Sequence, residues 1–211
     1  MPDIAPTHEQ PRLNRRQAAK IRTRGKVLDA ARALFAERGY DAATIRDIAK
    51  AAGMSTGAVF ANFQDKAELF ETVLADEMAA LLTAVQAGTP KDGPVADRLV
   101  SALSAGYHRS LDQLPLMQAT IARSWFQPAE ADQRARTFTQ PLIDHVAGVL
   151  RDGVGAGQLR QDGDLTLLAG LVWTLFVSNF RQAAYDGLDL AQLETRLRTQ
   201  IDLVLQGQRT A

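Results

Sequence analysis

Apolar side chains recur at intervals of three and four residues along most of the chain, the spacing that places them on one face of an α-helix. The first such stripe covers residues 27–35, and Gly39 follows it where a helix C-terminus favours glycine. Strict alternation of apolar and polar positions, which is typical of a half-buried strand, is nearly absent. The pattern therefore predicts an all-α fold of about nine helices.

Three short elements follow the first helix. Thr44 precedes an apolar pair at a place where its hydroxyl can cap the first turn of a helix. A turn over residues 52–54 separates this helix from a second short one, which Ser55 caps. Asp65 then caps a long helix. These signals predict two short helices at an angle, followed by a long one.

The remainder of the chain reads as a helical bundle broken by proline and glycine, and its last two helices are expected at about 164–185 and 190–206. The first of these is apolar almost all round. Its longest apolar run, 165–180, spans only roughly 24 Å, which is short for a bilayer core of about 30 Å. The N-terminus is polar and basic where a signal peptide needs an apolar core. We therefore expect a buried or interface helix, no membrane association and a cytoplasmic location.

Composition adds an asymmetry of charge. The net charge of the 211 residues is zero, and 46% of them are hydrophobic, which excludes a disordered or fibrous chain. Residues 1–63 nevertheless carry a net charge of +5 and residues 64–211 a net charge of −5. A basic head on an acidic body indicates that the head faces a polyanion. The absence of cysteine excludes disulfides and thiolate metal sites.

Residues 44–63 have the pattern of a helix-turn-helix, with the sequence TIRDIAKAAGMSTGAVFANF. Small Ala49 suits the close approach of the two helices, and Gly53 permits a tight turn. Small or polar side chains face outward from the second helix and suit a major groove about 12 Å wide: Thr56, Gly57, Ala58 and Asn62. An ordinary helical hairpin is the alternative, but the adjoining basic segment favours DNA binding.

The stretch from Lys26 to Phe70 resembles the N-terminal domain of the TetR family of bacterial regulators. The matching residues are LFAERGYDAATIRDIAKAAGMSTGAVFANFQDKAELF. The resemblance implies an N-terminal three-helix DNA-binding domain on a helical body that binds a ligand and dimerises. It implies a repressor that a small-molecule inducer releases from a palindromic double-stranded DNA operator.

The resemblance also implies roles for single residues. Thr44 and Ser55 would each cap a helix beside a phosphate, Arg46 would read a base edge, and Lys66 would bind phosphate. Thr56, Gly57 and Ala58 would face the floor of the groove. Two positions depart from the family pattern: Phe60 stands where tyrosine is usual, and Asn62 where histidine is frequent. Phe60 lacks a hydroxyl for phosphate, whereas Asn62 can still donate to one.

We divide the chain into a basic arm over 1–20, a DNA-binding domain over 21–70 and a ligand-binding and dimerisation domain over 71–211. From Arg12 to Lys26 the sequence holds seven cations and no acid. Two interpretations of the arm stay open. It is either a flexible tail, or an extension of the first helix that gains phosphate or minor-groove contacts on DNA.

A homodimer through the last two helices is expected, because a helix that is apolar all round needs cover on every side. Burial of that helix within one chain is the alternative. A ligand pocket is a weaker inference, since core packing explains each aromatic residue as well. The candidate ligand-binding residues combine apolar bulk with a few polar groups: Tyr107, Met117, Arg123, Trp125, Phe126, His145, Trp173 and Phe176.

Two other classes of function compete with a ligand-released repressor. An enzyme is disfavoured because the three histidines are scattered and the sequence has no phosphate loop, G-x-S-x-G motif or cysteine nucleophile. We therefore expect no catalytic residues, no cofactor and no metal. An activator, or a DNA-binding protein that responds to no ligand, would use the same helix-turn-helix, and the sequence of the body does not separate these from a repressor.

Overall fold

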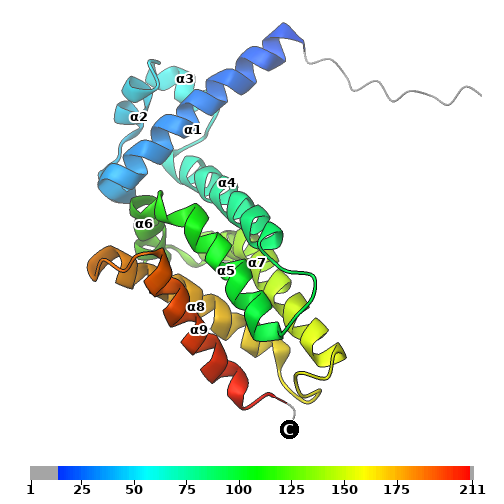
Figure 1. The fold of residues 1–211 in the computed structure, drawn as a ribbon. Helices are drawn as coiled ribbons and strands as arrows, with labels where there is room; N and C mark the ends of the chain where they lie inside the picture. Colours follow the sequence, from blue (N-terminus) through cyan, green and yellow to red (C-terminus); the bar gives the residue numbers. More distant parts are fainter. Residues whose placement is uncertain (1–13, 210–211) are drawn as a thin grey trace, which may run out of the picture.

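The computed structural model describes residues 14–209, which form nine α-helices and, within that range, no β-strand (Figure 1). None of the helices in this part of the chain is long and apolar enough to cross a membrane. The predicted all-α fold is therefore confirmed. The helices are α1 (Arg15–Ala42), α2 (Ile45–Ala51), α3 (Thr56–Phe60), α4 (Lys66–Ala87), α5 (Val95–Leu111), α6 (Leu114–Ser124), α7 (Ala129–Gly155), α8 (Leu165–Tyr185) and α9 (Leu190–Gln206).

The start of α1 corrects the division of the chain into segments. Residues 15–20, which the sequence assigned to a flexible arm, form the first turns of α1. Asn14 accepts hydrogen bonds from the backbone of Arg16 and Gln17, and the Gln17 side chain accepts one from the Asn14 N–H at 3.0 Å. This reciprocal capping box lets the helix begin far ahead of its packed part. Residues 1–13 of the arm lie outside the described residues.

Two glycines shape the head, the part built from α1, α2, α3 and the first half of α4. Gly39 has φ +75°, so it breaks the regular path of α1 close to its end, where the sequence predicted a C-terminal glycine. Gly53 has φ +67° in the turn between α2 and α3. Residues with a Cβ rarely adopt this conformation, which explains glycine at both positions.

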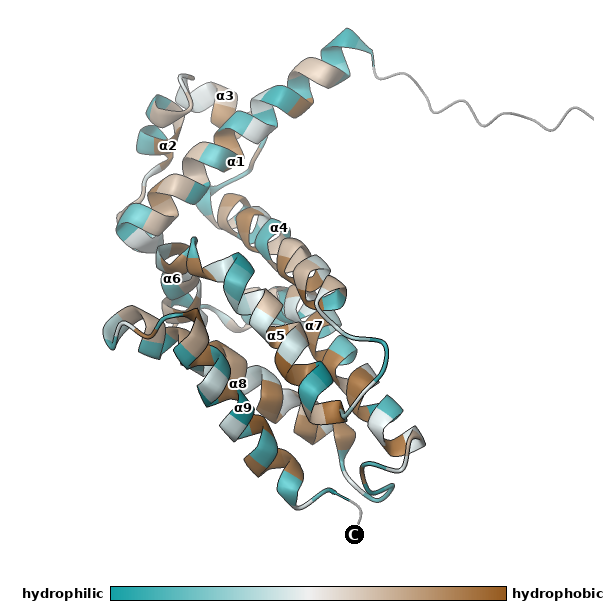
Figure 2. Ribbon diagram, viewed as in Figure 1, coloured by the Kyte–Doolittle hydropathy of each residue, from teal (hydrophilic) through white to brown (hydrophobic). Residues whose placement is uncertain are grey.

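The core consists of two hydrophobic clusters, one in the head and one in the body (Figure 2). Both clusters include residues of α4, which runs from the head into the body. Helix α6 also joins them: its Leu116 is buried in the head cluster, whereas the adjacent Met117 is buried in the body cluster. Helix α6 packs against α1 on one side and α8 on another. The head is therefore completed by a residue that lies far along the chain.

A buried polar network fixes α5, α8 and α9 relative to one another. Asn179 is fully buried, and its Nδ2 donates to the Tyr107 hydroxyl at 2.9 Å and to Gln200 Oε1 at 2.8 Å. The Tyr107 hydroxyl donates to the Phe176 carbonyl at 3.2 Å. Arg196 Nε donates to Asn179 Oδ1 at 3.0 Å. Because buried polar groups are costly without partners, this network favours one arrangement of the three helices.

Candidate nucleic-acid interface

The two short helices α2 and α3 form the predicted helix-turn-helix. Ile48, Ala49, Val59 and Phe63 are buried against α1 and α4 in the head cluster. The Thr44 hydroxyl accepts from the Asp47 N–H at 3.2 Å and donates to the Asp47 carboxylate at 2.6 Å. This hydrogen bond, with the nearby Arg38 cation, keeps the pKa of Asp47 below its usual value. The capping predicted at Thr44 is confirmed.

The outward side of α3 is small and open. Ser55 caps it, because its Oγ accepts from the Ala58 N–H at 3.2 Å. Thr56 and Gly57 are exposed, and Ala58 is partly exposed. A Cβ added at Gly57 would meet only the Ser55 hydroxyl, at 3.8 Å, so the fold does not require glycine there. The missing side chain instead leaves room for a partner surface to approach the backbone of α3.

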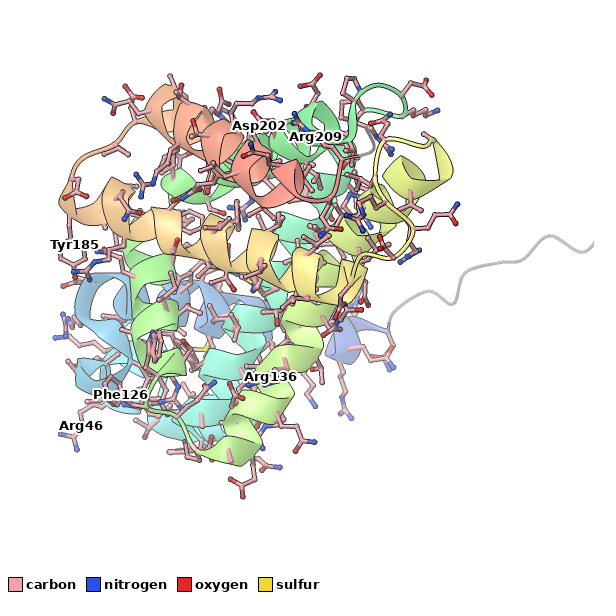
Figure 3. All side chains as sticks on the ribbon, turned by 90° about the horizontal axis from the view of Figure 1, so that it is seen from below. Arg46, Phe126, Arg136, Tyr185, Asp202 and Arg209 are labelled. Carbon is pink, nitrogen blue, oxygen red and sulfur yellow. The ribbon has the colours of Figure 1, made fainter. Side chains whose placement is uncertain are left out.

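Arg46 and Phe60 extend the open surface on either side. Arg46 lies on the exposed side of α2 and points away from the ribbon (Figure 3), and no group among residues 14–209 pairs with it. The Phe60 ring is 54% exposed at the end of α3. A free guanidinium can donate two hydrogen bonds to a guanine edge or to a phosphate, which agrees with the predicted role of Arg46.

Lys66 differs from its predicted role as a free phosphate ligand. Its ammonium donates to three backbone carbonyls at the end of α1: Tyr40 at 2.9 Å, Asp41 at 3.1 Å and Ala43 at 3.1 Å. The ammonium also lies 4.4 Å from the centre of the Tyr40 ring. A lysine has three N–H donors, and all three are used. The geometry thus indicates that Lys66 caps the C-terminal end of α1.

Asn62 is also turned inward, contrary to the expectation that it faces DNA. Its Nδ2 donates to the Ala58 carbonyl at 2.9 Å, and its Oδ1 is buried without a hydrogen-bond partner. The backbone carbonyl of Asn62 accepts from Arg24 at 2.7 Å, and the Arg24 guanidinium lies 4.1 Å from the centre of the Phe63 ring. Arg24, which the sequence placed in the basic arm, therefore fastens α1 to the end of the helix-turn-helix.

Comparison with known proteins agrees with this geometry. Residues 27–73 match the family model described as bacterial regulatory proteins, tetR family. The helix-turn-helix (HTH) type transcriptional repressor AcnR of Corynebacterium glutamicum is 46% identical over 186 residues, which cover 83% of this chain and 94% of that protein. The HTH-type transcriptional repressor Rv1474c of Mycobacterium tuberculosis is 33% identical over 180 residues, which cover 82% and 92%. The chain belongs to the TetR family.

The TetR-family fold extends over the body as well. The crystal structure of FadR from Bacillus subtilis in complex with stearoyl-CoA superposes with a TM-score of 0.76 at 17% identity, and covers 87% of this chain and 98% of that one. This likeness concerns the fold alone. Family membership and the two repressor relatives identify the chain as a DNA-binding transcriptional repressor of the TetR family. These relatives are transcriptional regulators, not enzymes.

The residues predicted to bind a ligand fall into different surroundings in this TetR-family body. Tyr107, Met117 and Phe176 are buried, and the Tyr107 and Phe176 rings stack with their centres 4.5 Å apart. Burial raises the pKa of the Tyr107 hydroxyl. Trp125 is 79% exposed and Phe126, labelled in Figure 3, is 91% exposed, so Phe126 lines no enclosed cavity. These positions do not form the single apolar pocket that the sequence suggested.

A groove of about 620 Å³ between α6 and α8 does bring two of the predicted residues together, Trp125 and Trp173. His145 lies elsewhere, with its Nε2 2.8 Å from the Thr89 hydroxyl, in a recess that Arg98 also lines. Arg123 stacks on the Tyr40 ring at 3.4 Å from its centre and lies 5.3 Å from the centre of the Phe70 ring. Arg123 is therefore part of the contact between α6 and the head, a role that its sequence position does not reveal.

Proposed function

We propose that this repressor binds a palindromic DNA operator as a homodimer and that a small molecule releases it. Residues 21–70 would read the DNA, and residues 71–211 would dimerise and bind the ligand. The open side of α3, with exposed Thr56 and Gly57 beside the unpaired Arg46, is the observation that supports DNA reading most directly. Bacterial DNA lies in the cytoplasm, which is where the protein would act.

A second protomer is supported by apolar side chains on the outer faces of α8 and α9. Leu167 is 60% exposed, Leu171 44% and Leu203 65%. These leucines lie on the two last helices, which the buried network around Asn179 holds together. A helix this short reads only a few base pairs, so two copies on symmetric half-sites are needed for a specific site.

Release would proceed through the helices that connect body and head. Helix α4 begins beside the helix-turn-helix and continues into the body cluster. Helix α6 carries Leu116 into the head cluster and lines the groove at Trp125. A ligand that binds better to a second arrangement of α4 and α6 would change the spacing of the two α3 helices and weaken the fit to successive grooves.

Footprinting of the purified protein on genomic DNA would test the operator. We expect a protected palindrome whose half-sites are about one helical turn, or a multiple of it, apart. Arg46→Ala should weaken binding by about 1–3 kcal/mol and relax the preference for one base position. Arg151→Ala, an exposed arginine of the body, is the matched control and should leave binding unchanged. Equal loss on operator and random duplex would show that Arg46 contacts only the backbone.

The oligomeric state is tested separately, by light scattering coupled to gel filtration. The wild-type chain should elute as a dimer, and Leu171→Glu should shift it to a monomer because a carboxylate would be buried at the interface. A monomeric wild type would overturn the homodimer. A reporter gene under the footprinted operator would distinguish repression from activation, and the loss of DNA binding with added compounds would identify an inducer.

A further inference from the structure

The beginning of α1 presents a basic surface that lies ahead of the segment matched by the family model, which starts at residue 27. Residues 15–26 hold six cations and no acid, and this end of α1 projects beyond α2 and α3 (Figure 1). Arg24 contacts the helix-turn-helix, as described above. The other five form no side-chain hydrogen bond or ion pair within residues 14–209: Arg15, Arg16, Lys20, Arg22 and Lys26.

This charge arrangement opposes the helix that carries it. The N-terminus is the positive end of the helix dipole, and the first turn of α1 holds no acidic residue to complement it. Arg16 and Lys20 are four residues apart, as are Lys20 and Arg24, so like charges face each other along the helix. The capping box at Asn14 offsets part of the cost. An uncompensated cationic helix of this kind points to a polyanion as its partner.

The contact of Arg24 shows which side of α1 faces the helix-turn-helix. Its guanidinium donates to the Asn62 carbonyl just after α3. Side chains four residues apart share a helix face, so Lys20 and Arg16 continue this line about 6 and 12 Å further along the axis. At about 100° per residue, Arg15 and Arg22 lie on the opposite side of the helix. The cations thus divide into a line on the α3 side and a pair that faces away.

We propose that Arg16 and Lys20 bind backbone phosphates of the duplex that flanks the base pairs read by α3. This inference rests on the proposed function, because α3 in the major groove is what brings the duplex alongside the line from Arg24 to Arg16. The contacts are independent of base sequence, and they extend each half-site beyond the reach of α3. Arg15 and Arg22 contribute only to the general field of the head.

The test compares two double variants that remove the same charge from the same helix turns, Arg16→Ala/Lys20→Ala and Arg15→Ala/Arg22→Ala. Fluorescence anisotropy measures binding between 50 and 200 mM salt, on the footprinted operator with flanking duplex on both sides. Each phosphate contact contributes about 0.9 to the slope of log K against log salt, so the first variant should lose about 1.8. The advantage of wild type over it should then be about tenfold larger at 50 mM than at 200 mM.

The second variant should change the slope by less than about 0.5. Equal slopes for both variants would overturn the proposal, as would a wild-type slope in the first. Helix content and thermal unfolding of both variants show that the fold is kept. Failure of the proposed function is a different result: the wild type then binds operator and random duplex equally, while the comparison of the two faces of α1 is still read from the slopes on either duplex.

Discussion

Lys66→Met separates a structural role of this lysine from a phosphate contact. The substitution keeps an unbranched apolar stem and removes the ammonium, which leaves the carbonyls of Tyr40, Asp41 and Ala43 without their shared donor. Charged hydrogen bonds contribute about 1.5–3 kcal/mol each, but water can reach a partly exposed site and replace part of them. With the loss of the contact to the Tyr40 ring, we expect a fall of about 2–3 kcal/mol in the free energy of unfolding.

Two measurements on Lys66→Met decide between the roles. Thermal unfolding should show a Tm lowered by about 4–12 °C, given about 2–4 °C per kcal/mol for a chain of this size. The salt slope of DNA binding, measured well below that Tm, should equal that of the wild type. Lys50→Met, at an exposed lysine of α2, is the control and should leave Tm nearly unchanged. A slope reduced by about 0.9 with an unchanged Tm would refute the capping role and restore the phosphate contact.

Three further substitutions probe the head, its joint with the body, and the body. Phe60→Tyr places a hydroxyl on an exposed ring and should raise the salt slope by about 0.9 at unchanged Tm; an unchanged slope would place the ring away from phosphate. Arg123→Ala removes the cation over Tyr40 and should keep operator binding but blunt its release by inducer, which a titration with inducer measures. Burial, with the Arg98 cation, lowers the pKa of His145 below 6.5. The unfolded chain therefore takes up the proton first as pH falls, and the wild type should lose more Tm than His145→Gln between pH 7.5 and 5.5. Parallel losses would show that His145 does not report this burial.

The features that sequence predicted well are those in which cause and effect lie within a few residues. Thr44, Ser55 and Asp65 each cap a helix through a backbone N–H three positions on. Gly39 and Gly53 take the positive φ that their place at helix ends suggested. Such signals depend on local geometry, so one sequence is enough to find them. The start of α1 was missed because the pair Asn14 and Gln17 was not considered as a cap.

The site residues that were misassigned depend on contacts between distant parts of the chain. Lys66 reaches carbonyls 23–26 positions earlier, and Arg24 reaches a carbonyl 38 positions later. Arg123 meets Tyr40 across the joint between α6 and α1. A surface cation and a cation buried in such a contact look the same in sequence, because only the fold decides what lies within reach of a long side chain. Aromatic residues of the body share this ambiguity between core and pocket.

The place of Leu116 has a consequence for building chimaeric regulators. A designer who exchanges DNA-reading heads between relatives would cut the chain after the family-matched segment, near residue 73. That cut leaves behind Leu116, which is only 1% exposed and completes the head from α6. The transplanted head would carry an open hole against α1, with a cost of about 2–5 kcal/mol for a lost leucine side chain. A graft that includes residues 114–124 as a second, non-contiguous piece would travel with its own wall.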